Sequence, residues 1–449
     1  MVYGKIVLGV GTILKARGSL GLLCSECVIL RRFYMQIAAY YFPNYHRDAR
    51  NEKLHGQGWT EWNLVRDAKP RFPGHRQPNL PTWGFEDEAD PAVMARKIDA
   101  AADHGIDAFI FDWYWYEDGP FLQRALDEGY LGAPNSNRLK FALMWANHDW
   151  LDIHPLKRSI APYDDARLLY PGAVGEAAFE RLIDHCLERY FKHPSYWLLD
   201  GCPYFSIYEL TKLMAGLGGL DATRKMLDRF RQRVRQAGFK DLHLNAVVWG
   251  NPILPGETSP TDDREVVEAL GFDSVTSYVW IHHYAARAFP SVDYAAIRDA
   301  YFRHWEEAAE RFRCPYFPNI TMGWDSSPRT VQSDIYENLG YPFMYRIANN
   351  TPENFKKALI MTRERLAEQN LPHPFITINA WNEWTEGSYL EPDLQNGMAY
   401  LEAIRECAKH PPAQASSLAS EPWRSSADFE AVKEEIKAKE YVSAQLRSE

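Results

Sequence analysis

The stretch Met35-Gln-Ile-Ala-Ala-Tyr-Tyr-Phe42 opens the part of the chain whose pattern decides the fold. It is apolar along its whole length, as expected of a strand that other layers cover on both faces. Seven further runs of this kind follow, and helical patterns separate them. The eight candidate strands are Ile37–Phe42, Ala108–Trp113, Phe141–Trp145, Tyr204–Tyr208, Leu242–Trp249, Ser274–Val279, Tyr316–Met322 and Phe375–Trp381.

The segments between these strands have the periodicity of amphipathic helices. In the clearest one, Pro91–His104, Asp90 suits the N-cap, Pro91 the first helical position and Gly105 the stop. The alternation of strands and helices predicts an α/β protein with a closed (β/α)₈ TIM barrel. An open doubly wound sheet is the alternative, but no Gly-rich phosphate loop follows the first strand. The other predicted helices are Glu176–Phe191, Ala222–Ala237, Tyr294–Phe312, Pro352–Gln369 and Gly397–Ala408.

The chain divides into three predicted parts, of which the barrel, residues 35–410, is the largest. Within it, residues 43–89 form a long insertion between the first strand and the first helix, and such loops are often functional. Residues 1–34 mix charged and apolar patches in an order unlike that of a signal peptide. We therefore expect Met35 as the natural start, a non-functional extension before it, and a cytoplasmic rather than secreted protein. Residues 411–449 are expected to be a C-terminal tail or a peripheral helix.

Charge and cysteine content argue against several function classes. The net charge of −10 and the pI near 5.8 argue against a nucleic-acid partner, because such proteins present a basic face. No apolar run reaches the ~18 residues that a membrane span needs. The six cysteines are scattered, and Cys24 and Cys27 form a CxxC without a second pair to complete a zinc site. We expect no cofactor, and the sequence does not indicate an oligomeric state.

Aromatic residues make up 14% of the chain, with 15 Trp and 25 Tyr, which fits either a rich core or a lined cleft. Barrel enzymes place their sites at the carboxyl ends of the strands. Every candidate strand carries an aromatic residue at or near that end, and five have an acid close by. This clustering favours a cleft that binds a carbohydrate. The candidate substrate-binding residues are Tyr41, His46, Trp59, Glu61, Trp62, Asp112, Trp113, Tyr114, Trp145, Asn147, His148, Asp149, Tyr208, Trp249, Tyr278, Trp280, Trp324, Asp325, Trp381, Asn382, Trp384 and Tyr389.

Two of these candidates allow a closer interpretation. Asp112 lies inside an apolar run, where a carboxyl group needs a partner, and this favours a place in the site. Glu61 is either an acid that braces its loop or a sugar contact. No metal is expected, because the spacing of the nearby histidines and acids matches no ligand pattern. These residues are His148, Asp149, His154, His282 and His283.

Two glutamates, Glu383 and Glu386, follow the last strand and are the candidate catalytic pair. Glycoside cleavage uses two carboxyl groups, one to protonate the departing oxygen and one as nucleophile or base. Their spacing allows both the ~5–5.5 Å separation of retaining enzymes and the ~6.5–9.5 Å of inverting ones. Crowding two carboxylates also raises one pKa, which suits an acid catalyst. The alternative is that Glu386 starts a helix or lies on the surface.

Three motifs of the chain are Gly56-Gln-Gly-Trp-Thr-Glu-Trp62, Trp145-Ala-Asn-His-Asp-Trp150 and Asn379-Ala-Trp-Asn-Glu-Trp-Thr-Glu-Gly-Ser-Tyr-Leu-Glu-Pro-Asp393. Together they resemble those of the WbsX family, which is often labelled glycosyltransferase or lipopolysaccharide-biosynthesis protein. The resemblance covers roughly residues 36–408. The family is in turn similar to glycoside hydrolase family 99, the endo-α-mannosidase group, and the likeness implies a (β/α)₈ barrel with a carbohydrate substrate. In the commoner pattern Glu and Asn stand where this chain has His148 and Asp149, so substrate recognition there is expected to differ.

The resemblance also implies roles for the two glutamates in a retaining reaction. Glu383 would be the base that deprotonates the sugar's own 2-hydroxyl, which attacks C1 to give a 1,2-anhydro intermediate. Glu386 would be the general acid and then the general base. Three functional hypotheses follow: a glycoside hydrolase first, a glycosyltransferase of surface polysaccharide second, and a non-catalytic glycan-binding barrel third. The second is weakened because Asp90, Asp112 and Asp325 offer no Asp-x-Asp pair.

Overall fold

The computed structural model describes residues 35–161, 166–254, 256–286, 288–369 and 371–409. The predicted N-terminal extension and C-terminal tail lie outside these residues. Within them no helix is long and apolar enough to cross a membrane.

Nine parallel strands form the barrel, and their order confirms the predicted fold. Adjacent strands pair from β10 back to β1, β1 pairs with β15, and β15 pairs with β13. β12 and β13 are separated by Pro318 alone, so together they fill the seventh position and close the circuit. The strands are β1 (Gln36–Tyr41), β2 (Ala108–Tyr116), β4 (Lys140–Trp145), β8 (Cys202–Ile207), β9 (His243–Val247), β10 (Ser274–Thr276), β12 (Tyr316–Phe317), β13 (Asn319–Thr321) and β15 (Phe375–Asn379).

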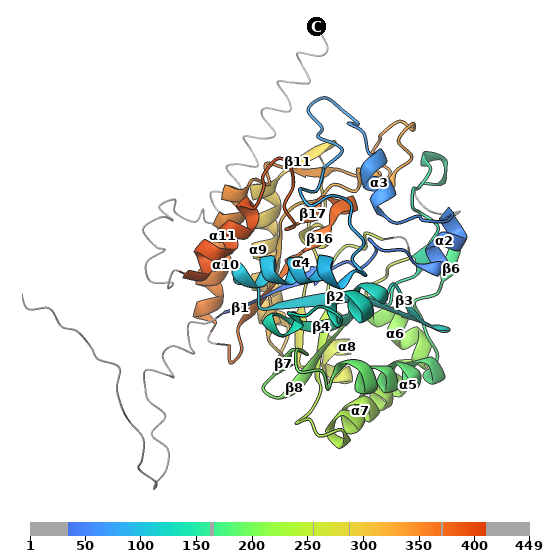
Figure 1. The fold of residues 1–449 in the computed structure, drawn as a ribbon. Coiled ribbons are helices and arrows are strands. Elements are labelled where there is room, and N and C mark those ends of the chain that lie inside the picture. The colour runs from blue at the N-terminus through green and yellow to red at the C-terminus, as the bar shows by residue number, and fades with distance from the viewer. Residues whose placement is uncertain (1–34, 162–165, 255, 287, 370, 410–449) are drawn as a thin grey trace, which may run out of the picture. The chain divides into compact units, whose positions relative to one another are not determined.

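Helices surround the strands, as Figure 1 shows. The first of them, α4 (Pro91–Asp103), begins as expected, because the Asp90 side chain accepts a hydrogen bond from the Ala92 N–H at 2.8 Å. Two helices, α6 (Leu210–Leu217) and α8 (Asp263–Leu270), were not predicted, because each is only eight residues long. The other main helices are α5 (Glu176–His185), α7 (Leu220–Gln236), α9 (Tyr294–Arg311), α10 (Pro352–Glu368) and α11 (Ala399–Lys409).

Long loops gather at the carboxyl ends of the strands. The insertion after β1 contains two short helices, α2 (Ala49–His55) and α3 (Trp62–Asp67). The loop after β4 reaches the loop after β13, where the Leu156 N–H donates to the Arg329 carbonyl at 2.8 Å. Other short strands are β3 (Gly119–Phe121), β5 (Trp150–Leu151), β6 (Leu168–Tyr170), β7 (Leu198–Leu199), β11 (Ser291–Asp293) and β14 (Arg346–Ala348). Other short helical segments are η1 (Ala125–Tyr130), η2 (Ser136–Arg138), η3 (Arg158–Ile160), η4 (Cys186–Tyr190) and η5 (Trp280–His283).

A buried ion cluster fastens α4 to the loop after β15. Lys97, on α4, is 2% exposed, and its Nζ lies 2.8 Å from Glu391 and 3.5 Å from Glu88. Glu391 accepts the indole N–H groups of Trp381 and Trp384 at 2.9 and 2.6 Å. Because all three charged groups are buried, each depends on its partners to offset the loss of water.

We predict that Lys97→Met destabilises the protein by about 3–5 kcal/mol, because it leaves two buried carboxylates without their cation. Lys356→Met is the matched control, since Lys356 pairs with Glu406 at the surface and such pairs contribute about 0–1 kcal/mol. Urea unfolding of both variants measures the difference. Equal losses in the two variants would contradict the structural importance of the cluster.

Candidate active site

The two candidate catalytic glutamates lie on a tight hairpin after β15. Glu383 ends β16 (Asn382–Glu383) and Glu386 ends the turn η7 (Trp384–Glu386), before β17 (Ser388–Tyr389). Gly387 follows at φ +63°, and a Cβ there would lie 2.8 Å from the Asp325 Cβ, so only glycine fits. The Asn382 amide bonds both the N–H and the carbonyl of Phe42 at 2.8 Å, which fixes the hairpin to the end of β1.

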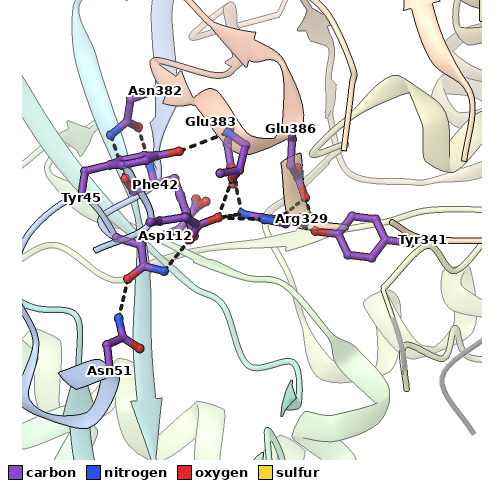
Figure 2. Close-up of polar contacts among 12 residues, drawn as sticks. Phe42, Tyr45, Asn51, Asp112, Arg329, Tyr341, Asn382, Glu383 and Glu386 are labelled. Carbon is purple, nitrogen blue, oxygen red and sulfur yellow. Dashed lines mark hydrogen bonds and ion pairs between the residues drawn. The ribbon is translucent and has the colours of Figure 1, made fainter. Parts of the chain in front are cut away.

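A buried guanidinium joins the two glutamates. Arg329 ends the turn η6 (Ser327–Arg329) and is 5% exposed. Its Nη2 lies 3.3 Å from Glu383 Oε2, and its Nη1 donates to Glu386 Oε1. Tyr341 also donates to Glu386 Oε1, at 2.8 Å. Figure 2 shows the Arg329 guanidinium between the two carboxylates, with Tyr341 beyond it.

A third carboxylate, Glu61, completes the set around Arg329. It accepts from Arg329 Nε at 2.8 Å and is fully buried. Asn44 donates to its other oxygen at 2.5 Å, and Thr385 donates to Oε1. Asn51 in turn donates to Asn44 at 2.7 Å. The structure therefore places Glu61 as a brace of the insertion, whereas sequence left this role and a sugar contact open.

Asp112 and Tyr278 form a second polar contact beside the pair. The Tyr278 hydroxyl donates to Asp112 Oδ2 at 2.7 Å and contacts Glu383 Oε1 at 3.2 Å. Asp112 Oδ1 is buried and has no hydrogen-bond partner among the described residues. Asp112 also lines the hollow described next.

These groups form one end of a hollow at the mouth of the barrel. Including the solvent at its opening, the empty volume is about 710 Å³. Thirteen lining residues were not among the predicted contacts, and Arg329, His282 and Tyr341 are among the polar ones. A second hollow of about 760 Å³ shares Ile253, Leu254 and Tyr341 with the first. The predicted site residues that line the first hollow are Asp112, Tyr114, His148, Asp149, Tyr208, Tyr278, Trp324, Glu383 and Glu386.

Five predicted contacts point away from the hollow, towards the helices. Trp145 packs on Phe179 of α5, and Trp280 packs on Tyr294 and Tyr301 of α9. The reason is geometric, because successive side chains of a strand face opposite sides of the sheet. Choosing candidates by their position near a strand end therefore selected side chains on both faces of the sheet. The five residues that the structure places on the helix side are Tyr41, Trp113, Trp145, Trp280 and Trp381.

The remaining predicted contacts lie in the packing around the site and do not line the hollow. Trp384 stacks on Tyr389 with ring centroids 3.8 Å apart, and Trp62 lies 5.7 Å from Trp384. Asp325 accepts from His75 and Gln77, so its carboxylate ties the insertion to the loop after β13. The full set is His46, Trp59, Glu61, Trp62, Asn147, Trp249, Asp325, Asn382, Trp384 and Tyr389.

Burial sets the protonation of the acids at the site. It raises the pKa of Glu383 well above its usual range, and Glu386 beside it adds to the rise. It also raises the pKa of Glu386, although Arg329 and Tyr341 oppose this. For Glu61 burial acts in the same direction, but the Arg329 guanidinium prevails and lowers its pKa. These two glutamates therefore hold protons far more readily than a surface pair does.

The histidines of the hollow are neutral at physiological pH. Burial lowers the pKa of His148 to about 4, and that of His154 and His282 to about 3. Among the described residues, no group of three or more His, Cys, Asp or Glu side chains is arranged to hold a metal ion. His148 instead packs edge-on to Tyr208, with ring centroids 5.7 Å apart.

Two further buried acids, Glu209 and Glu257, support the wall of the hollow. Glu257 accepts the N–H groups of Ile253 and Leu254, both at 2.7 Å, and the hydroxyl of Tyr208 at 2.5 Å. Burial raises the pKa of Glu257 to about 7 and that of Glu209 to about 8, where Glu257 adds to the rise. Glu209 is one of the acids that the sequence places close to a strand end, whereas no sequence signal marked Glu257, because its partners lie on separate loops.

The raised pKa of Glu209 predicts a pH-dependent stability. A carboxyl group with a higher pKa in the folded state binds more protons there, so stability falls as pH rises from about 4.5 towards 8. Glu209→Gln should therefore raise Tm by roughly 2 °C at pH 8 and leave it unchanged at pH 4.5. Thermal unfolding measures both values. Glu188→Gln, at an exposed position, is the control, and an equal gain for Glu209→Gln at both pH values would contradict the argument.

Comparison with known families and curated proteins gives one consistent result. A family model described as "Glycosyltransferase WbsX" matches residues 37–404. The uncharacterized protein WxcX of Xanthomonas campestris pv. campestris (strain B100) is 28% identical over 398 residues, which cover 86% of this chain. The chain spans about half the length of that relative, 51% of it.

One solved structure shows the same architecture, and a second is reported beside it. A glycoside hydrolase-like protein aligns with a TM-score of 0.55 at 17% identity, covering 84% of this chain and 94% of its own. The GH99 endo-alpha-mannosidase from Bacteroides thetaiotaomicron aligns with a TM-score of 0.48 at 14% identity, covering 85% and 98%. At such identities the first likeness establishes the fold alone.

Proposed function

The chain belongs to the WbsX family, and we propose that it is a carbohydrate-active enzyme that hydrolyses glycosidic bonds in an oligo- or polysaccharide with retention. The observation that carries this proposal is the pair Glu383 and Glu386 at one hollow in the mouth of the barrel, joined by the same guanidinium. Retaining hydrolysis needs two carboxyl groups that face one bond. Neither side chain of the pair is turned into solvent, since each is 3% exposed.

Glu386 is proposed as the general acid and then the general base. Arg329 and Tyr341 both contact its Oε1, which leaves Oε2 as the oxygen that carries a proton towards the hollow. Its raised pKa keeps that proton available at a pH where a surface glutamate has lost it. The proton would pass to the departing glycosidic oxygen, and the resulting carboxylate would later take a proton from water.

Glu383 is proposed as the base towards the sugar's 2-hydroxyl, which then closes on C1 in a 1,2-anhydro intermediate. Removing a proton from a hydroxyl needs an ionised carboxylate. Burial and then Glu386 raise the pKa of Glu383 well above its usual range, and the Arg329 guanidinium opposes this rise and favours the ionised form. Tyr278 and Arg329 contact its two oxygens at 3.2 and 3.3 Å, so the carboxylate is oriented before substrate arrives. Asp112, with one unpartnered oxygen, is proposed to bind a substrate hydroxyl.

The charges around the hollow favour a neutral glycan over a nucleotide sugar. Among the described residues that line it, Arg329 is the one side chain that is cationic at neutral pH, and three carboxylates already engage it. The three lining histidines are neutral because burial lowers the pKa of each to about 4 or below. A diphosphate would therefore meet carboxylates and no free cation, which disfavours its binding.

The central test is the substitution of each glutamate. Glu383→Gln and Glu386→Gln should each lower turnover by about 10²–10⁴-fold, because each removes a proton-transfer group but keeps the shape of the side chain. Cleavage of labelled bacterial polysaccharides and oligosaccharides, followed by chromatography, measures the loss. Glu402→Gln, on the exposed face of α11, is the control and should keep full activity. Unchanged turnover in both site variants would remove the proposal.

Activated substrates separate the two roles. A 2,4-dinitrophenyl glycoside of the released sugar needs no proton on its leaving group, so Glu386→Gln should recover at least about tenfold of its lost activity on it. Glu383→Gln should recover none, since the attack on C1 still needs the base. Recovery in Glu383→Gln instead would exchange the two assignments.

A second candidate, transfer from a nucleotide sugar, rests on the name of the family model. Thermal shift distinguishes the two, because a ligand that binds only the folded state raises Tm by mass action. We expect UDP-, GDP- and dTDP-sugars to leave Tm unchanged, and the released oligosaccharide to raise it. A Tm rise with any one of the nucleotide sugars would favour transfer.

A further inference from the structure

Glu61 shares its cation with the two glutamates of the site. It belongs to the insertion after β1, and its carboxylate is fully buried. Nε and Nη2 of Arg329 both lie 2.8 Å from Glu61 Oε1, whereas Nη2 lies 3.3 Å from Glu383 Oε2. Nη1 of the same side chain donates to Glu386. Because one guanidinium serves all three carboxylates, the charge of Glu61 acts on the other two.

The contacts of Glu61 favour its ionised form. Asn44 donates to its Oε2 at 2.5 Å, and Thr385 donates to its Oε1. Burial acts to raise the pKa of Glu61, but the Arg329 guanidinium prevails and lowers it below its usual value. Burial raises the pKa of both glutamates of the site. Glu61 is therefore an anion at a pH where those two still hold protons.

The other titratable groups around this contact are buried, and burial favours their neutral forms. It raises the pKa of the tyrosines and of the two further acids, and it lowers the pKa of the histidines. Asp149 pairs separately with Lys212 at 2.6 Å. Arg329 and Glu61 are therefore the charges that act most directly on Glu383 and Glu386, and their signs are opposite. The buried groups are Tyr45 and His55 of the insertion, Asp112 and Tyr114 of β2, His148 and His154 of the loop after β4, Tyr208 after β8, Glu257 of the loop after β9, Tyr278 and His282 after β10, and Tyr341 of the loop after β13.

Resting on the proposed function, we propose that Glu61 is a positioning residue that sets, through Arg329, the pH range in which Glu383 and Glu386 exchange their protons. Its negative charge offsets the guanidinium, so the two glutamates meet little net positive charge. Glu61 accordingly acts to raise the pKa of both, and Arg329 acts to lower it. Without the charge of Glu61, Arg329 would draw the proton from Glu386 at a lower pH, and the leaving group would lose its acid.

The pH profile of kcat/KM tests the proposal, with a labelled bacterial polysaccharide that the parent protein cleaves as substrate. Glu61→Gln keeps the shape of the side chain and removes its charge, so both limbs of the profile should move to lower pH by roughly one unit. Arg329→Gln removes the opposing charge and should move both limbs to higher pH. Limbs that stay in place in Glu61→Gln, or that move to higher pH, would overturn the proposal.

Two control variants separate the charge of Glu61 from its role as a brace. Asp325 is also a buried carboxylate that ties the insertion to the loop after β13, but its bonds go to His75, Gln77 and the Ser327 N–H. Asp325→Asn should therefore destabilise the protein and leave both limbs in place. Glu61→Asp keeps the charge and should move the limbs much less than Glu61→Gln does. Equal shifts in Asp325→Asn and Glu61→Gln would point to a loosened insertion and overturn the proposal.

A titration without turnover separates this proposal from the proposed function. Protein labelled with ¹³C at the glutamate carboxyl carbons reports each ionisation by NMR, and the resonances lost in Glu383→Gln, Glu386→Gln and Glu61→Asp assign the three sites. In Glu61→Gln, Glu383 and Glu386 should both titrate at lower pH than in the parent protein. If these shifts occur but no glycan is cleaved, hydrolysis fails and the effect of Glu61 is retained.

The parent protein gives a test that does not depend on the folding of Glu61→Gln. As pH falls, Glu61 should stay ionised until after Glu383 and Glu386 have taken up their protons. A Glu61 that takes up its proton before them would overturn the proposal, because it would then carry no charge in the range where they titrate.

Discussion

The rest of the site depends on the contact of one buried guanidinium with three carboxylates. Arg329 engages Glu61, Glu383 and Glu386, and it lies as many as 268 residues from these partners in the sequence. The contact therefore ties the insertion, the loop after β13 and the hairpin after β15 to a single point. Burial is the largest cause of the raised pKa of Glu383 and of Glu386, and the Arg329 guanidinium opposes the rise in both.

The barrel frame decides which side chains reach this point. Along β2 the alternation sends Asp112 and Tyr114 into the hollow and Trp113 between the sheet and the helices. Burial on both sides explains why the strand is apolar throughout and why an acid within it needs a partner, which Tyr278 supplies. The same rule makes the rim rich in aromatic residues without making all of them substrate contacts.

The sequence predicted the features that have a local cause. Eight apolar runs, the N-cap at Asp90 and the paired glutamates are each visible within a few residues, and the structure has the predicted strand order. Arg329 was not predicted, because its partners lie on loops that meet only in the folded barrel. The helix-side position of Trp145 and Trp280 was also missed, because proximity to a strand end does not reveal which face a residue occupies.

The tryptophans on either side of Glu383 explain how the hairpin that carries Glu383 and Glu386 is kept rigid. Trp381 and Trp384 flank Glu383 in sequence, and both indoles donate to Glu391, which Lys97 neutralises from α4. On the other side the hairpin is fixed to β1 through Asn382. A carboxylate that must act on a developing charge is most effective when it needs no rearrangement. The contacts that hold the hairpin in place would therefore serve the proposed chemistry. Under the proposed function, the aromatic richness of the chain contributes to the reaction through packing as much as through any contact with sugar.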